Sequence, residues 1–235
     1  MNYRNIIQLG KHRLMCGNST DINDIQLLLN GIKADMVFID PPYGINYKGC
    51  RYDLGKKKQI KIDDDYTKLN TAKLLDNTIL RAAKPLADIY ICVSPIRQKI
   101  YLDYLDSINR TPDAVIVWDK NSMGMGYMKY RRRCEFILYS KGKPFRRNED
   151  SSDMDLWSIP KDNIRNYKHP NQKPIALAKR AIINSSKEND IILDTFGGSG
   201  STLLACEETN RICYMMEIDP NYCDIILERY KNYVK

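Results

Sequence analysis

The stretch "DIILDTFGGSGSTLLACEE" (residues 190–208) decides the fold, because it joins a short apolar strand to a helix through a glycine-rich turn. Glycine suits such a turn, since a residue without Cβ tolerates positive φ and lets a ligand approach the backbone. The helix that follows presents free N–H groups at its first turn. This order predicts either a ligand-binding loop or a tight connection without a ligand.

A carboxylate further along the chain favours the ligand-binding alternative. Glu217 ends the apolar run of residues 211–217 and follows Gly198 by 19 residues. A doubly wound sheet places an acid there to accept hydrogen bonds from the hydroxyls of a ribose. Leu203 stands where a dinucleotide fingerprint starting at Gly198 needs glycine, and the chain lacks the Gly-Lys-Ser/Thr of a P-loop. The loop therefore predicts an adenosine-containing cofactor, with neither pyrophosphate motif satisfied.

Short apolar runs recur along the chain and are separated by helix-like patterns. This alternation is typical of a parallel sheet covered by helices on both faces. The expected helices occupy residues 22–31, 67–83, 97–108, 174–187, 200–209 and 220–233. The expected strands occupy residues 12–17, 35–39, 88–93, 114–118, 134–139, 190–194 and 211–217. We therefore expect one α/β domain, residues 1–235, with a doubly wound and mostly parallel seven-stranded sheet.

The charge of the chain indicates an anionic partner. With 37 basic and 29 acidic residues, the net charge is +8. Residues 119–147 hold nine Lys or Arg against two acids, and residues 48–62 hold six against one. Such runs are often solvated faces, but here they are interleaved with Tyr, Phe and Met. This pattern favours a surface that binds phosphates.

The cysteines indicate the redox state of the compartment and whether a metal site is present. There are seven of them, an odd number without CxxC pairs, which argues against a disulfide framework and against a zinc site. We expect a reducing, cytoplasmic environment and no metal. No stretch of 18 apolar residues occurs, so we expect no membrane insertion.

A second motif, "IDPPYG" (residues 39–44), follows the expected strand 35–39. An acid, two residues that cannot donate backbone hydrogen bonds and an aromatic residue end this strand. Taken alone, Asp40, Pro41, Pro42 and Tyr43 are more typical of a stiff turn than of a functional site. The rest of the chain has to decide between these interpretations.

Three motifs together resemble those of amino-group DNA methyltransferases. The loop "DTFGGSGST" is similar to the D-x-F-x-G-x-G loop with which these enzymes bind S-adenosylmethionine, and "DPPY" is similar to their catalytic tetrapeptide. The segment "HPNQKP" (residues 169–174) resembles the one that precedes their cofactor loop. Because the tetrapeptide precedes the cofactor loop, the chain resembles the β group, whose Rossmann-like sheet is circularly permuted.

The resemblance implies a set of cofactor-binding residues. In the loop and the helix that follows it, these are Asp194, Phe196, Gly198, Ser199, Gly200, Ser201 and Thr202. Glu217 would hold the ribose, Lys173 would approach the carboxylate of the cofactor, and Asn18 stands where the family usually has an acid. The amide oxygen of asparagine still accepts hydrogen bonds, although it is uncharged.

The resemblance also implies a role for each residue of the tetrapeptide. An exocyclic amine is a poor nucleophile, because its lone pair is delocalised into the ring. If Asp40 and the carbonyl of Pro41 each accept one amine hydrogen, the lone pair is freed for direct in-line attack on a sulfonium methyl group held nearby, and the carbon–sulfur bond breaks as the new bond forms. Pro42 would fix the turn, and Tyr43 would stack a base that has been flipped out of the duplex.

The resemblance to this family predicts site-specific methylation of the N6 of adenine in double-stranded DNA. The expected DNA-binding residues are Lys129, Arg131, Arg132, Arg133, Lys56 and Lys57. Methylation of cytosine N4 is the nearest alternative, and a DNA-binding module without catalysis is another. A methyltransferase acting on RNA or on a protein amide would share the tetrapeptide.

Target recognition is expected in an insertion at residues 142–168. So short a region predicts a short recognition sequence or a second subunit that completes it, for example in a homodimer. We expect a stand-alone bacterial or phage enzyme of restriction-modification, without an appended domain.

Overall fold

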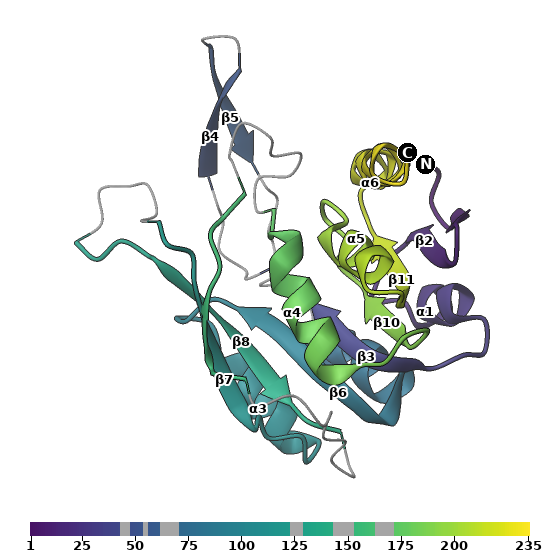
Figure 1. Cartoon of the computed structure of the whole chain (residues 1–235), viewed down its shortest axis with the longest axis horizontal. Coiled ribbons are helices and arrows are strands. Elements are labelled where there is room, and N and C mark those ends of the chain that lie inside the picture. The colour runs from purple at the N-terminus through teal and green to yellow at the C-terminus, as the bar shows by residue number, and fades with distance from the viewer. Residues whose placement is uncertain (43–47, 54–55, 62–70, 123–128, 143–152, 163–171) are drawn as a thin grey trace.

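The computed structural model describes residues 1–42, 48–53, 56–61, 71–122, 129–142, 153–162 and 172–235. Its centre is a nine-stranded sheet (Figure 1). In chain order the strands are β1 (Ile6–Leu9), β2 (His12–Cys16), β3 (Ala34–Ile39), β6 (Ala83–Val93), β7 (Ala114–Asp119), β8 (Cys134–Ser140), β9 (Leu156–Ser158), β10 (Ile191–Asp194) and β11 (Ile212–Glu217). The strands β4 (Lys48–Asp53) and β5 (Lys56–Lys61) form a separate antiparallel ribbon, which stands clear of the sheet in Figure 1.

Across the sheet the strands run in the order β1-β2-β11-β10-β3-β6-β8-β7-β9. Neighbours from β2 to β6 are parallel, and β8 is antiparallel to both of its neighbours. The last two strands of the chain, β10 and β11, therefore lie between β2 and β3. The chain winds outward from the β10–β3 pair in both directions, which confirms the doubly wound and permuted arrangement.

The helices are α1 (Ile22–Leu29), α2 (Thr71–Leu75), a π-helical segment (Asp76–Arg81), α3 (Lys99–Ser107), α4 (Ile175–Ser185), α5 (Ser201–Glu208) and α6 (Pro220–Tyr233). Their ends follow local chemistry. The side chain of Asp219 accepts a hydrogen bond from the backbone N–H of Asn221, and Pro220 occupies the first turn of α6. Helix α1 has the same kind of cap at Asp21 and ends at Asn30, whose φ of 50° is left-handed.

The sequence predictions agree with most of these elements. All seven expected strands are present, and the sheet gains β1 and β9. Strand β9 lies within residues 142–168, the expected insertion, and pairs in parallel with β7. The helix expected at residues 67–83 is the least accurate prediction, because its described part is a short α-helix followed by a π-helical turn, and β6 already begins at Ala83.

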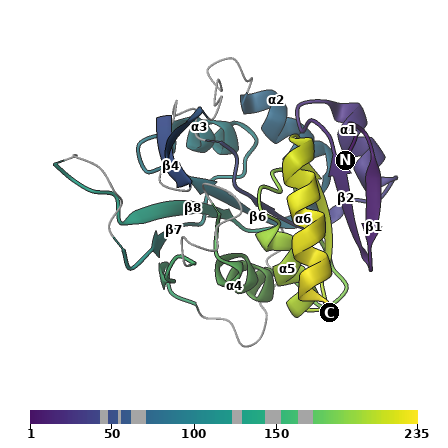
Figure 2. The same ribbon diagram turned by 90° about the horizontal axis from the view of Figure 1, so that it is seen from above.

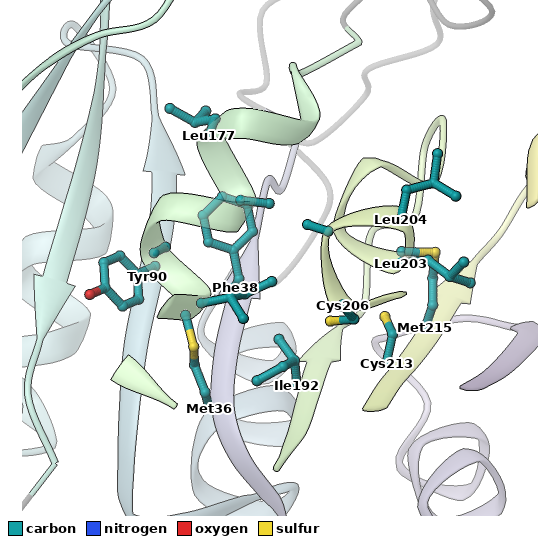
Figure 3. Packing of buried hydrophobic residues seen from close by; sticks show 14 of the residues in the cluster. Met36, Phe38, Tyr90, Leu177, Ile192, Leu203, Leu204, Cys206, Cys213 and Met215 are labelled. Carbon is teal, nitrogen blue, oxygen red and sulfur yellow. The ribbon is translucent and has the colours of Figure 1, made fainter. Parts of the chain in front are cut away.

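Two apolar clusters hold the layers together, one on each face of the sheet, and Figure 2 shows the helices that cover these faces. Helices α4, α5 and α6 cover one face, where Phe38 and Ile192 pack against Leu177 and Leu203 (Figure 3). Helices α1, α2 and α3 cover the other face. Among the helices that the structure describes, none combines the length and the apolar character needed to cross a membrane.

Candidate active site

The carboxyl ends of β3 and β10 lie side by side, because these strands pair in parallel with Val37 opposite Leu193. In open α/β sheets, ligands bind at such a point, where the chain winds away in both directions. A cavity of about 340 Å³ opens there. It is lined by Gly17, Asn18, Ser19, Thr20, Phe38, Asp40, Pro42, Gln172, Lys173, Ala178, Asp194, Thr195, Phe196, Gly197, Gly198, Ser199, Ser201, Thr202, Glu217, Ile218, Asp219 and Tyr222.

The glycine loop adopts the conformations that its sequence predicts. Gly198 and Gly200 have φ angles of 52° and 80°, which L-residues rarely adopt. The loop is also packed from behind, since a Cβ on Gly200 would lie 3.0 Å from a side-chain carbon of Ile226. Helix α5 then starts with the buried residues Ser201 and Thr202. The loop therefore forms one wall of the cavity with its backbone.

Glu217 ends β11 beside this loop. One carboxylate oxygen accepts the N–H of Gly198 at 2.7 Å, and the other accepts the N–H of Asp219 at 2.9 Å. Burial raises the pKa of Glu217 above its ordinary value, although both N–H groups oppose that shift. Because each carboxylate oxygen has two lone pairs, Glu217 can fix the loop and still accept a further hydrogen bond.

Asp194 ends β10 at the floor of the cavity. Its side chain accepts the N–H of Phe196 at 2.9 Å and a hydrogen bond from Thr202. Burial nevertheless raises its pKa to about 7, since taking a carboxylate out of water disfavours the charged form. A positive charge arriving in the cavity would therefore favour ionisation of Asp194.

Two other side chains hold the glycine loop in place. Arg229 of α6 donates to the carbonyl of Ser199 at 2.9 Å and to its hydroxyl at 3.0 Å. The hydroxyl of Ser201 donates to the carbonyl of Lys173 at 2.6 Å. The loop is thus tied both to α6 and to the segment that precedes α4.

Asn18 follows β2, which pairs with β11 in the sheet, and it lines the cavity. Its side-chain oxygen accepts hydrogen bonds from the backbone N–H of Thr20 at 3.0 Å and from the Thr20 hydroxyl at 2.8 Å. Its own N–H donates to Asp24 at 2.9 Å. Asn18 therefore shapes a turn beside the cavity, and its role in cofactor binding stays a prediction.

On the other side of the cavity, Asp40 is ion-paired. The ammonium of Lys173 lies 2.5 Å from Asp40 Oδ2 and 3.2 Å from Glu135 Oε2. The other Glu135 oxygen lies 3.2 Å from the ammonium of Lys120. Pro41 is buried and Pro42 lines the cavity, whereas Tyr43 lies outside the described residues. In this structure the Lys173 side chain thus contacts the catalytic acid that the sequence predicts.

The ion pairs decide the charge states of these groups. Burial opposes ionisation of Glu135, but Lys173 and Lys120 outweigh it and lower the pKa of Glu135 to about 2. Burial also opposes the charged form of Lys173, yet Asp40 and Glu135 raise the pKa of Lys173 above its ordinary value. Glu135 and Lys173 are therefore charged at neutral pH.

The expected DNA-binding residues differ in their surroundings. Lys129, Arg131 and Arg132 are exposed near the start of β8. Arg133 is also exposed, but both carboxylate oxygens of Asp119 accept its hydrogen bonds, at 2.6 and 2.7 Å. Lys56 and Lys57 belong to β5, and their side chains lie outside the described part of the structure.

Sequence reasoning missed three residues of the site: Lys120, Glu135 and Arg229. Glu135 carried a signal, because an acid inside the apolar run "CEFILY" is unusual unless it has a partner. Lys120 and Arg229 carried none that distinguishes them from the many surface lysines and arginines. Their partners lie on distant segments of the chain.

Comparison with known proteins agrees with the fold and the motifs. The model of the DNA methylase family that covers N6 and N4 enzymes matches residues 34–228. The type II methyltransferase M.HpaI of Haemophilus parainfluenzae is 26% identical over 92% of this chain and 73% of its own length. M.HhaII of Haemophilus parahaemolyticus is 30% identical over 108 residues, and this matched region makes up 44% of this chain and 47% of that relative.

Solved structures share the fold. A complex of M1.HpyAVI with SAM superposes with a TM-score of 0.68 at 24% identity and covers 92% of this chain and 98% of its own. The cytosine-N4-specific PvuII DNA methyltransferase superposes with a TM-score of 0.66 at 14% identity, over 96% and 92% of the two chains.

Proposed function

The chain belongs to the DNA methylase family, and we propose that it transfers a methyl group from S-adenosylmethionine to the N6 amine of adenine in double-stranded DNA. One observation carries the proposal. Asp40 and Asp194, the first residue of the glycine-loop motif, are 154 residues apart in the sequence. They nevertheless lie at the ends of adjacent strands and line one cavity. A methyl donor and an amine acceptor site would therefore meet at one edge of the sheet.

The residues that line the cavity fit this cofactor. Four of them are acids, Asp40, Asp194, Glu217 and Asp219, and Lys173 is the single lysine or arginine among the lining residues that the structure describes. Such a lining disfavours a pyrophosphate and favours a cationic ligand with hydroxyl groups. S-adenosylmethionine has a ribose and supplies its methyl group from a positively charged sulfur.

Individual residues of the cavity would hold the cofactor as follows. Glu217 would accept hydrogen bonds from the ribose hydroxyls, and the backbone of Gly198 and Gly200 would allow close approach. Asp194 would stay ionised once a cation is bound. Asn18 would border the same side of the ligand.

Asp40 would accept one hydrogen of the exocyclic amine, and the Pro41 carbonyl would accept the other. The fixed φ of Pro41 and Pro42 limits the directions in which that carbonyl can point. Holding the amine and the methyl group at near-attack distance contributes up to roughly 7–11 kcal/mol in favourable cases. The reaction needs no covalent enzyme intermediate.

DNA would reach this cavity as a flipped nucleotide. Unpairing and unstacking a base costs a few kcal/mol, and stacking on Tyr43 would offset part of that cost. Exposed basic residues such as Arg131 and Arg132 would bind the phosphates. The relatives are named type II methyltransferases, which supports a role in restriction-modification in a bacterial cell.

Nucleoside mass spectrometry of DNA treated with the purified protein tests the choice of base. The proposal expects N6-methyladenine and no modified cytosine. N4-methylcytosine as the sole product would show that the cytosine alternative, which belongs to the same family model, is correct. Methylation of RNA in preference to duplex DNA in a competition assay would contradict the assigned substrate.

A further inference from the structure

Four charged side chains form a line that begins at the catalytic acid. Asp40 follows β3, Lys173 precedes α4, Glu135 lies on β8 and Lys120 follows β7. Successive charges alternate in sign, and the three contacts between them measure 2.5, 3.2 and 3.2 Å. We call this set the charge line. It joins four segments of the chain that are distant in sequence.

Both lysines of the charge line are held in fixed surroundings. Their side chains are only 6% exposed for Lys120 and 10% exposed for Lys173. Each ammonium also lies about 6 Å from the centre of the Trp118 ring, at 6.0 Å for Lys120 and 5.9 Å for Lys173. Buried ion pairs add little net stability compared with apolar packing, so stability alone is a weak reason for the arrangement.

We propose that Glu135 is a positioning residue for methyl transfer, which holds the Lys173 ammonium in place beside Asp40 so that the Asp40 carboxylate stays oriented to accept an amine hydrogen. This inference rests on the function proposed for Asp40. A carboxylate has lone pairs enough to bind the ammonium and to accept an N–H at the same time. Glu135 acts through Lys173 and touches no reacting atom.

The geometry predicts that Lys173 and Glu135 have opposite effects on the ionisation of Asp40. Lys173 favours the carboxylate of Asp40, because an opposite charge within 4–6 Å lowers the pKa of an acid by roughly 1–3 units. Glu135 and Asp40 contact the same ammonium, so their nearest oxygens are at most about 6 Å apart, and Glu135 partly opposes that effect. Lys120 in turn weakens the influence of Glu135.

Other titratable groups also face Asp40. Asp194 on β10 and Cys92 on β6 interact with it electrostatically, and Lys161, beyond β9, interacts with the remainder of the charge line. These groups are unchanged in the variants used below. Differences between variants therefore report the members of the charge line themselves.

The test is the pH dependence of single-turnover methyl transfer to unmethylated genomic DNA at saturating S-adenosylmethionine. Lys173→Met should move the acidic limb of the rate profile upward by about one pH unit or more. Glu135→Gln should move the limb downward and lower the plateau rate, because Lys173 then loses the carboxylate that holds it in place beside Asp40. Lys120→Met should move the limb upward by less than Lys173→Met does.

A matched control is the Lys179–Glu208 pair, which joins α4 to α5 at 2.8 Å and does not line the cavity. Glu208→Gln should leave the limb in place. A purely structural role for Glu135 would lower the rate of Glu135→Gln without moving the limb downward, and that result overturns the proposal. If the Glu135→Gln variant does not fold, the proposal is overturned when neither Lys173→Met nor Lys120→Met moves the acidic limb.

The outcome is separable from that of the proposed function. Full activity of Asp40→Ala would contradict the proposed function. An inactive Asp40→Ala variant combined with limbs that move in one direction, or not at all, would contradict only the role of Glu135.

Discussion

Two acids end neighbouring strands of the sheet, yet their electrostatic surroundings are opposite. Asp194, at the end of β10, is bonded to a backbone N–H and a hydroxyl, and burial raises its pKa to about 7. Asp40, after β3, has the ammonium of Lys173 at 2.5 Å. The chain thus supplies a cation to one carboxylate, and the donors described for the other are neutral.

Under the proposed function, this difference separates the cavity into a cofactor side at Asp194 and a catalytic side at Asp40. On the cofactor side, a cationic ligand would favour ionisation of Asp194, so ligand binding and charge are coupled. On the catalytic side, Lys173 favours the ionised form of Asp40 before any ligand arrives. Variants of each side should therefore affect different steps of the reaction.

The largest effect on the cofactor side is expected for Gly200→Ala. A left-handed backbone costs an L-residue about 1–2 kcal/mol, and the new Cβ would lie 3.0 Å from Ile226. Calorimetric titration should show at least about tenfold weaker binding of S-adenosylmethionine. Gly31→Ala is the matched control, since Gly31 has a φ of 81° and open space around its Cβ position. Equal affinity in the Gly200→Ala and wild-type proteins would refute the assignment of this loop to the cofactor.

The next effect is a pH dependence of cofactor binding. Below a pH of about 7, Asp194 is protonated in the ligand-free protein, so a cationic cofactor must displace that proton. Affinity should therefore rise with pH from 6 to 8, by at most about tenfold per unit. Asp194→Asn should bind more weakly at pH 8 and should show a flatter profile. An identical slope in both proteins would show that another group is responsible.

The smallest effect concerns the exposed basic residues that we propose bind the DNA phosphates. Arg131→Gln and Arg132→Gln should each reduce the slope of log affinity for duplex DNA against log salt by about one, if each neutralises one phosphate. Arg133→Gln should change the slope less, because Asp119 already binds its guanidinium. Fluorescence anisotropy at several salt concentrations measures these slopes. A larger change for Arg133 than for Arg131 would contradict the ranking.

The sequence predicted the parts of the fold that depend on local patterns. Apolar runs identified all seven expected strands, and caps such as Asp219 located helix ends. Strand β9 was not predicted, because three residues in a polar segment carry too little periodicity to be recognised. Trp157 is the buried residue of this strand, and it packs in the core against segments that are distant in sequence.

The residues of the candidate site also divide into those that local sequence patterns predict and those that depend on the tertiary fold. The glycine loop, Glu217 and Asp40 could be found because each lies at the end of a predicted strand and has a recognisable sequence or spacing. The charge line could not be found, since it depends on which strands become neighbours. Lys120 and Glu135 approach each other because β7 and β8 pair with Asp119 opposite Cys134. Lys173 joins them from a segment 38 residues after Glu135.

The most direct test of the division between the two sides uses Asp40→Ala. S-adenosylmethionine affinity is measured by calorimetry, and methyl transfer to unmethylated DNA is measured under single-turnover conditions with the same preparation. We expect cofactor affinity within about threefold of the wild-type value, a difference of less than 1 kcal/mol, and loss of methyl transfer. Retained methyl transfer, or loss of cofactor binding together with activity, would contradict the assignment of Asp40 to catalysis alone.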